Sequence, residues 1–223
     1  MSIAENIHRF KEGLPEGVKL VAITKTKPIE DIMEAYQAGH KIIGENKVQE
    51  LVDKYEELPK DIEWHMVGHL QSNKVKYIAP FVHLIHGVDR AKLFNVIDKE
   101  GRKNNRIIDI LMQFHIASEE TKFGFDLQEA KELLESEAFR NYEFLRVKGV
   151  MGMATFTDDM DQVRSEFREL VSIYNELKEK YFSADPEFKE ISMGMSSDYH
   201  VALEEGTTMV RIGSLIFGKR NIH

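Results

Sequence analysis

A lysine ends an apolar stretch near the amino terminus. Residues Val21 to Thr24 are apolar or β-branched, which predicts a buried strand, and Lys25 closes it before Pro28 begins a helix. In parallel α/β folds, ligands bind at the carboxyl ends of the strands. Apolar surroundings favour the neutral amine of a lysine, which can then attack a carbonyl. The alternative is a lysine that only reaches solvent, and this segment alone favours it, since lysines are seldom fully buried.

Two pairs of small or hydroxyl residues follow the last two predicted strands. Ser196-Ser197 and Gly213-Ser214 each precede a short predicted helix. Backbone amides at such positions, together with serine hydroxyls, can bind a phosphate group. Either pair alone is better explained by a serine that caps a helix. Because a phosphate site after strands seven and eight recurs in (β/α)8 barrels, the two pairs together make phosphate binding an equal alternative.

An arginine interrupts the last predicted strand. Arg211 stands in the otherwise apolar stretch Thr208–Gly213, so it must either pair with a carboxylate or face a polar ligand.

The histidine spacing, in contrast, predicts no metal site. His65 and His69 stand four apart on a predicted strand, about 13 Å from each other. His83 and His86 fall on opposite faces of the next strand. Neither pair can therefore bind one ion.

Strands and helices alternate along the chain, which predicts parallel strands joined by right-handed crossovers. The predicted strands are Val18–Lys25, Lys41–Gly44, Ile62–Gly68, Val82–Val88, Arg106–Ile116, Leu145–Ala154, Glu190–Met193 and Thr208–Ile212. Eight such units predict a closed (β/α)8 barrel, with an open doubly wound sheet as the alternative. No linker interrupts the series, so we expect residues 1–223 to form a single domain. We also expect Asp89 to cap the helix Ala91–Lys103, and the amphipathic segment Ile3–Lys11 to pack across the bottom of the barrel.

Composition narrows the classes of function. The chain has 223 residues, with 38 acidic and 30 basic side chains and a net charge of −8. This balance argues against broad nucleic-acid binding, and the absence of cysteine excludes disulfides and thiolate sites. No signal peptide or membrane-spanning run is present, so we expect a cytoplasmic protein with no membrane partner.

Seven stretches together resemble the YggS/PROSC family of pyridoxal phosphate homeostasis proteins. They are Val21–Pro28, Gly44–Glu50, Trp64–Lys74, Lys122–Gly124, Gly149–Met153, Ser192–Asp198 and Met209–Gly218. They occur in order between residues 21 and 218, a span of nearly the whole chain, and several are long and specific. One departure is His69, where proline or threonine is usual.

The resemblance implies a barrel like the amino-terminal domain of bacterial alanine racemase, with pyridoxal 5′-phosphate (PLP) as the cofactor. It implies a Schiff base between PLP and Lys25. It also implies that Arg211 faces the pyridine nitrogen of the cofactor. The further cofactor-binding residues implied are Asn46, Lys122, Ser196, Gly213 and Ser214.

Family members have no established turnover and are regarded as keeping PLP and amino-acid pools in balance. A cationic arginine beside the pyridine nitrogen makes the ring a weak electron sink. Racemases add a second base from an additional domain, which we do not expect here. We therefore predict a PLP-binding homeostasis protein without robust catalysis. A minimal PLP-dependent amino-acid racemase is the alternative, and a barrel aldolase with an imine-forming Lys25 is a distant third. We expect a monomer whose partners are PLP, free amino acids and PLP-dependent apo-enzymes.

Overall fold

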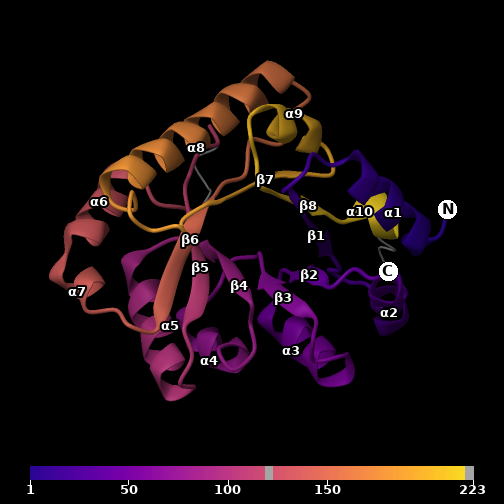
Figure 1. The fold of residues 1–223 in the computed structure, drawn as a ribbon, viewed down its shortest axis with the longest axis horizontal. Helices are drawn as coiled ribbons and strands as arrows, with labels where there is room; N and C mark the ends of the chain where they lie inside the picture. Colours follow the sequence, from indigo (N-terminus) through magenta and orange to yellow (C-terminus); the bar gives the residue numbers. More distant parts are fainter. Residues whose placement is uncertain (119–122, 219–223) are drawn as a thin grey trace.

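The computed structural model describes residues 1–118 and 123–218, in which parallel strands close into a barrel (Figure 1). The strands, in barrel order, are β1 (Lys19–Ile23), β2 (Ile42–Glu45), β3 (Glu63–Met66), β4 (Leu84–Val88), β5 (Ile108–Gln113), β6 (Leu145–Met151), β7 (Glu190–Met195) and β8 (Met209–Ile212). Strand β1 pairs with both β2 and β8, which closes the sheet. The predicted (β/α)8 barrel is thus confirmed, and the open sheet is not formed.

An outer layer of helices surrounds the strands (Figure 1). The helices are α1 (Ile3–Gly13), α2 (Ile29–Gln37), α3 (Val48–Glu57), η1 (Ser72–Lys74), α4 (Val75–Ile78), α5 (Ala91–Lys103), α6 (Leu127–Glu135), α7 (Glu137–Arg140), α8 (Met160–Lys180), α9 (Tyr199–Glu204) and α10 (Ser214–Phe217). Among the described residues, no helix is both long and apolar enough to cross a membrane.

Two details differ from the sequence prediction. Helix α1 does not lie across the bottom of the barrel but packs in the outer layer against α2 and α10. Helix α10 is only four residues long, so it leaves room there that α1 fills.

Asp89 does not cap α5, because Arg90 is the N-cap residue and its side chain makes no capping bond. The carboxylate of Asp89 instead pairs with the side chains of Arg90 and His69.

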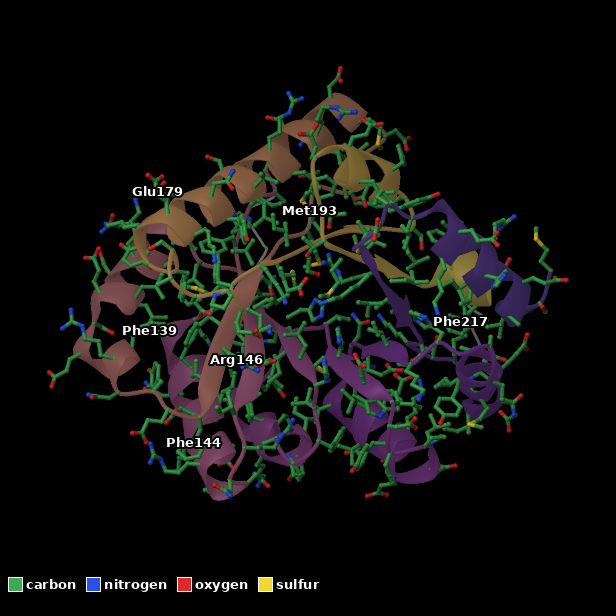
Figure 2. The ribbon with its side chains drawn as sticks, viewed as in Figure 1. Phe139, Phe144, Arg146, Glu179, Met193 and Phe217 are labelled. Atoms are coloured by element: carbon green, nitrogen blue, oxygen red, sulfur yellow. The ribbon has the colours of Figure 1, made fainter. Side chains whose placement is uncertain are left out.

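The apolar core has two parts. The larger part fills the space between the strands and the helices and includes Trp64, Phe94 and Phe167. Met193 and Phe217, which are labelled in Figure 2, also belong to it. The smaller part lies inside the barrel and includes Val21, Leu111 and Met151. Buried polar side chains, among them His86, Ser192 and Arg211, share this interior with the smaller part.

Candidate functional site

A cavity of about 460 Å³ lies at the carboxyl ends of the strands. Its lining includes six of the seven residues that the sequence singled out: Lys25, Asn46, Ser196, Arg211, Gly213 and Ser214. The seventh, Lys122, lies outside the described residues. A second hollow of about 490 Å³, at the amino ends of β1 and β2, is lined by none of them. The first cavity is therefore where the predicted site residues of the described chain lie together.

The buried ammonium group of Lys54 forms a hydrogen bond with the backbone next to Lys25. Lys25 follows β1 and is half-buried. Immediately before it, the carbonyl of Thr24 accepts a hydrogen bond of 2.8 Å from Lys54 Nζ on helix α3. The Thr24 hydroxyl also donates to Glu45 Oε1, at 2.5 Å. These bonds fix the end of β1 and therefore the point from which the Lys25 side chain starts.

The residue after Lys25 is held as well. Thr26 has φ of 62°, a left-handed conformation that a β-branched residue seldom adopts. Its N–H donates to Glu50 Oε1 at 2.6 Å, and the same oxygen lies 2.7 Å from Lys54 Nζ. Strain of this kind costs about 1–3 kcal/mol and persists where the surroundings enforce it, often next to a functional residue.

A buried carboxylate completes this network. Glu45 is fully buried at the end of β2, and its Oε1 accepts a hydrogen bond of 2.6 Å from Lys54. Burial raises the pKa of the Glu45 carboxyl, while the charge of Lys54 and its hydrogen bond oppose that rise. The sequence analysis assigned no role to Glu45 or Lys54, which act on the site through the Lys25 backbone.

Arg211 projects from β8 into the interior and is 4 % exposed. Its guanidinium donates to Ser192 Oγ at 2.6 Å and to the carbonyl of Gly152 at 3.2 Å. Within residues 1–118 and 123–218 it forms no ion pair with a carboxylate. Burial lowers the pKa of Arg211 to about 10, and the charge of Asp198 opposes the shift. The structure therefore does not show the ion pair that was one of the two alternatives for Arg211 among the described residues, and it places the side chain in the lining of the cavity.

A chain of polar groups leads from Arg211 toward the other end of the barrel. Ser192 Oγ lies 2.9 Å from His86 Nδ1, and His86 Nε2 lies 2.9 Å from His65 Nδ1. Burial lowers the pKa of both histidines well below the usual value, so both rings are neutral near pH 7. The chain of polar groups ends at His65.

The hydroxyl and glycine residues after β7 and β8 lie side by side. The N–H of Gly213 donates to Ser196 Oγ at 3.3 Å, which joins the two loops. A Cβ atom at Gly213 would lie 3.3 Å from the carbonyl oxygen of Ile23, two residues before Lys25. A side chain there would therefore press on the end of β1.

The lining also contains residues that the sequence analysis did not select, among them Lys27 and Phe156. Lys27 lines the same cavity as Lys25, and its Nζ donates to the carbonyl of Phe217 at 2.7 Å. Phe156, in the loop after β6, is 87 % exposed at the cavity. Its position just after a predicted strand could have indicated that Phe156 lies at the cavity. The sequence does not show the conformation of the loop, which decides whether such a residue reaches the cavity.

Comparison with known proteins agrees with this geometry. The family model described as "Alanine racemase, N-terminal domain" matches residues 1–221. A pyridoxal phosphate homeostasis protein of Aquifex aeolicus is 44 % identical over 222 residues, which cover 98 % of this chain and 95 % of the relative. The chain belongs to the family of pyridoxal phosphate homeostasis proteins. The Escherichia coli family member is 35 % identical over 211 residues, covering 93 % of this chain and 88 % of its own.

Solved structures share the fold of this chain. PipY of Synechococcus elongatus, a structure with PLP bound, superposes with a TM-score of 0.87 at 31 % identity, covering 97 % of this chain and all of PipY. An alanine racemase of Clostridium difficile superposes with a TM-score of 0.73 at 13 % identity. This chain covers 56 % of the racemase, and at that identity the likeness shows the fold alone.

Proposed function

We propose that this family member binds PLP in the cavity at the carboxyl ends of its strands, as a Schiff base on Lys25. It serves PLP and amino-acid homeostasis without robust catalysis. The observation that carries the proposal is the convergence of three groups on one cavity: Lys25, the guanidinium of Arg211 and the Ser196–Gly213–Ser214 cluster. Arg211 pairs with no carboxylate of the described residues. Residues 1–223 act as one domain.

The residues present fit the groups that PLP carries. An aldehyde needs an amine, which Lys25 supplies. A phosphate needs N–H and O–H donors, which the serines and the backbone near Gly213 and Ser214 supply. Arg211 is the partner for the ring nitrogen, and Asn46 lines the cavity beside Lys25. PLP would supply the ability to hold an amino group covalently and reversibly.

The relatives support the same ligand. The similar proteins of Aquifex aeolicus and Escherichia coli carry the name pyridoxal phosphate homeostasis protein, and PipY has been solved with PLP bound. Free amino acids and PLP-dependent apo-enzymes are the proposed partners of the protein, which acts as a monomer.

Borohydride reduction tests the proposal. Protein incubated with PLP is reduced and digested, and the modified peptide is located by mass spectrometry. We expect the label on Lys25, and Lys25→Ala should abolish it. Lys27→Ala is the matched control, since Lys27 lines the same cavity two residues away and should leave the label in place. A label on Lys27 in the wild type would show that the wrong lysine was chosen.

A further inference from the structure

Three side chains of types that can bind a metal ion lie close together at the end of the barrel opposite the PLP cavity. Glu63, His65 and His83 each offer one ligand atom, and these atoms lie within 4.8 Å of one another. Glu63 and His65 point the same way from β3, and His83 immediately precedes β4, the neighbouring strand. All three line a hollow of about 110 Å³ at the amino ends of the strands.

The deepest of the three has a ring nitrogen without a partner. His65 is 2 % exposed, and its Nε2 atom is buried without a hydrogen bond. Its other nitrogen, Nδ1, lies 2.9 Å from His86 Nε2. Histidines that bind metals almost always use the second ring nitrogen in a hydrogen bond of this kind, which fixes the ring and its tautomer. The contact between His65 and His86 is therefore the hydrogen bond that a metal-binding histidine normally makes with its second ring nitrogen.

Among the described residues that line the hollow, Glu63 is the one carboxylate without a lysine or arginine partner, so it can interact with a bound cation. The other charged residues of its lining have partners of opposite sign: Lys19 pairs with Glu190, Asp109 with Arg146, and Lys148 with Glu187. Within residues 1–118 and 123–218, Glu63 pairs with no lysine or arginine. Its Oε2 lies 3.5 Å from His83 Nε2.

We propose that Glu63, His65 and His83 bind one divalent transition-metal ion, with Zn²⁺ as the best match. Two imidazoles and a carboxylate, with a fourth position for water, suit Zn²⁺ and its neighbours rather than Mg²⁺ or Ca²⁺. Zinc–ligand distances of about 2.0–2.2 Å require the three ligand atoms to draw closer together. The ring of His83 must also turn, because it now lies parallel to His65. The side chains of His83 and Glu63 are 52 % and 45 % exposed, so both are free to move while His65 stays fixed.

The site lies apart from the PLP cavity, and its role is structural or regulatory. In (β/α)8 barrels, the amino-terminal face contributes stability and the carboxyl-terminal face contributes chemistry. An ion here would join β3 to the start of β4 and stabilise the native state by mass action. The proposal stands whether or not PLP binds to Lys25.

Metal titration of the full chain, after dialysis against a chelator, tests the site. Co²⁺ is followed by its visible absorption, and Zn²⁺ by competition with a coloured chelator. We expect a single equivalent to bind the wild type, and His83→Ala and Glu63→Gln to weaken binding by roughly tenfold or more. His8→Ala is the matched control, since His8 and Glu12 form an exposed pair with the same 3.5 Å separation. Equal binding by wild type and His83→Ala, or equal loss in His8→Ala, would overturn the proposal.

A second measurement avoids any variant of the buried histidine. Long-range ¹H–¹⁵N spectra of the imidazoles report which nitrogen carries the proton. With Zn²⁺ bound, the signal of His65 Nε2 should shift and the His65 proton should be on Nδ1, facing His86. If the His65 signals stay unchanged at saturating Zn²⁺, the hollow holds only solvent and the assignment is wrong.

Discussion

Lys54 Nζ donates a hydrogen bond of 2.8 Å to the backbone carbonyl of Thr24, the residue immediately before Lys25. The same ammonium contacts Glu45, which binds the Thr24 hydroxyl, and Glu50, which binds the Thr26 N–H. A single buried lysine on α3 thus anchors the backbone on both sides of Lys25. Lys54 is a positioning residue for the site, although it does not line the cavity.

Replacing Lys54 by methionine should destabilise the fold and loosen the site. The change leaves the buried Glu45 carboxylate without its cation, which costs about 3–5 kcal/mol when a buried pair is broken. Urea unfolding measures this loss. The control is Lys41→Met, which breaks the exposed pair with Asp61 and should cost far less. Similar losses in the two variants would contradict a supporting role for Lys54.

Each of the two serines of the proposed phosphate site should contribute only a small part of the free energy of PLP binding. If backbone amides hold most of the phosphate, Ser196→Ala and Ser214→Ala should each weaken PLP binding by only about 0.5–1.5 kcal/mol. Titration of the apo-protein with PLP, followed by absorbance, gives both values.

Gly213→Val should weaken PLP binding much more than either serine change. Its Cβ would lie 3.3 Å from the Ile23 carbonyl oxygen, so the added side chain must displace either the loop or the end of β1. Its thermal unfolding, measured alongside, separates a damaged site from a damaged fold. Equal and small effects of all three substitutions would argue against phosphate binding by this cluster.

Amino acids should not be racemised or transaminated at a useful rate. Among the described residues, the cavity lining contains lysines and an arginine but no carboxylate, histidine or tyrosine to serve as a second base. A cationic Arg211 would also give the ring nitrogen weak support for electron withdrawal. Mass spectrometry of alanine in deuterated water should therefore show no exchange at Cα on an enzymatic timescale. Rapid exchange that disappears in Lys25→Ala would instead establish the racemase alternative.

His40 should make folding stability depend on pH. Burial lowers the pKa of His40 to about 4, and its Nε2 lies 3.0 Å from the carbonyl of Ile42. The unfolded chain binds a proton at its ordinary pKa of 6.5 while the folded chain does not, so stability falls as the pH drops below that value. Between about pH 6.5 and about pH 4, this one group contributes a slope of at most about 1.4 kcal/mol per pH unit. Urea unfolding of wild type and His40→Gln at matched pH should show a shallower slope in the variant.

The sequence was sufficient to predict the barrel and most of the candidate cavity, because both follow from local patterns. Lys25, Asn46, Ser196 and Arg211 each stand at or near the end of a predicted strand, and parallel strands bring such ends to one face. No knowledge of contacts between distant residues was needed to place them together.

Contacts that depend on register or on distant segments could not be predicted in this way. Lys54 reaches Thr24 across 30 residues of sequence, and nothing in the α3 pattern distinguishes it from a solvent-exposed lysine. The histidines were compared with their near neighbours in sequence, whereas His65 meets His83 across two strands. The position of α1 depends on the shortness of α10, which a helix pattern near the end of the chain does not reveal.

The hydrogen bonds from Arg211 to His65 have a direction as well as a path. Arg211 can only donate, so Ser192 Oγ accepts from it and keeps a single proton to give. When that proton points to His86 Nδ1, His86 donates from Nε2 to His65, whose own N–H then faces the hollow. An ion bound to His65 Nε2 needs the reverse order, in which both histidines exchange tautomers and Ser192 turns its proton elsewhere. The two ends of the barrel interior are therefore not independent: the occupant of one end sets the orientation of the hydroxyl that Arg211 contacts at the other.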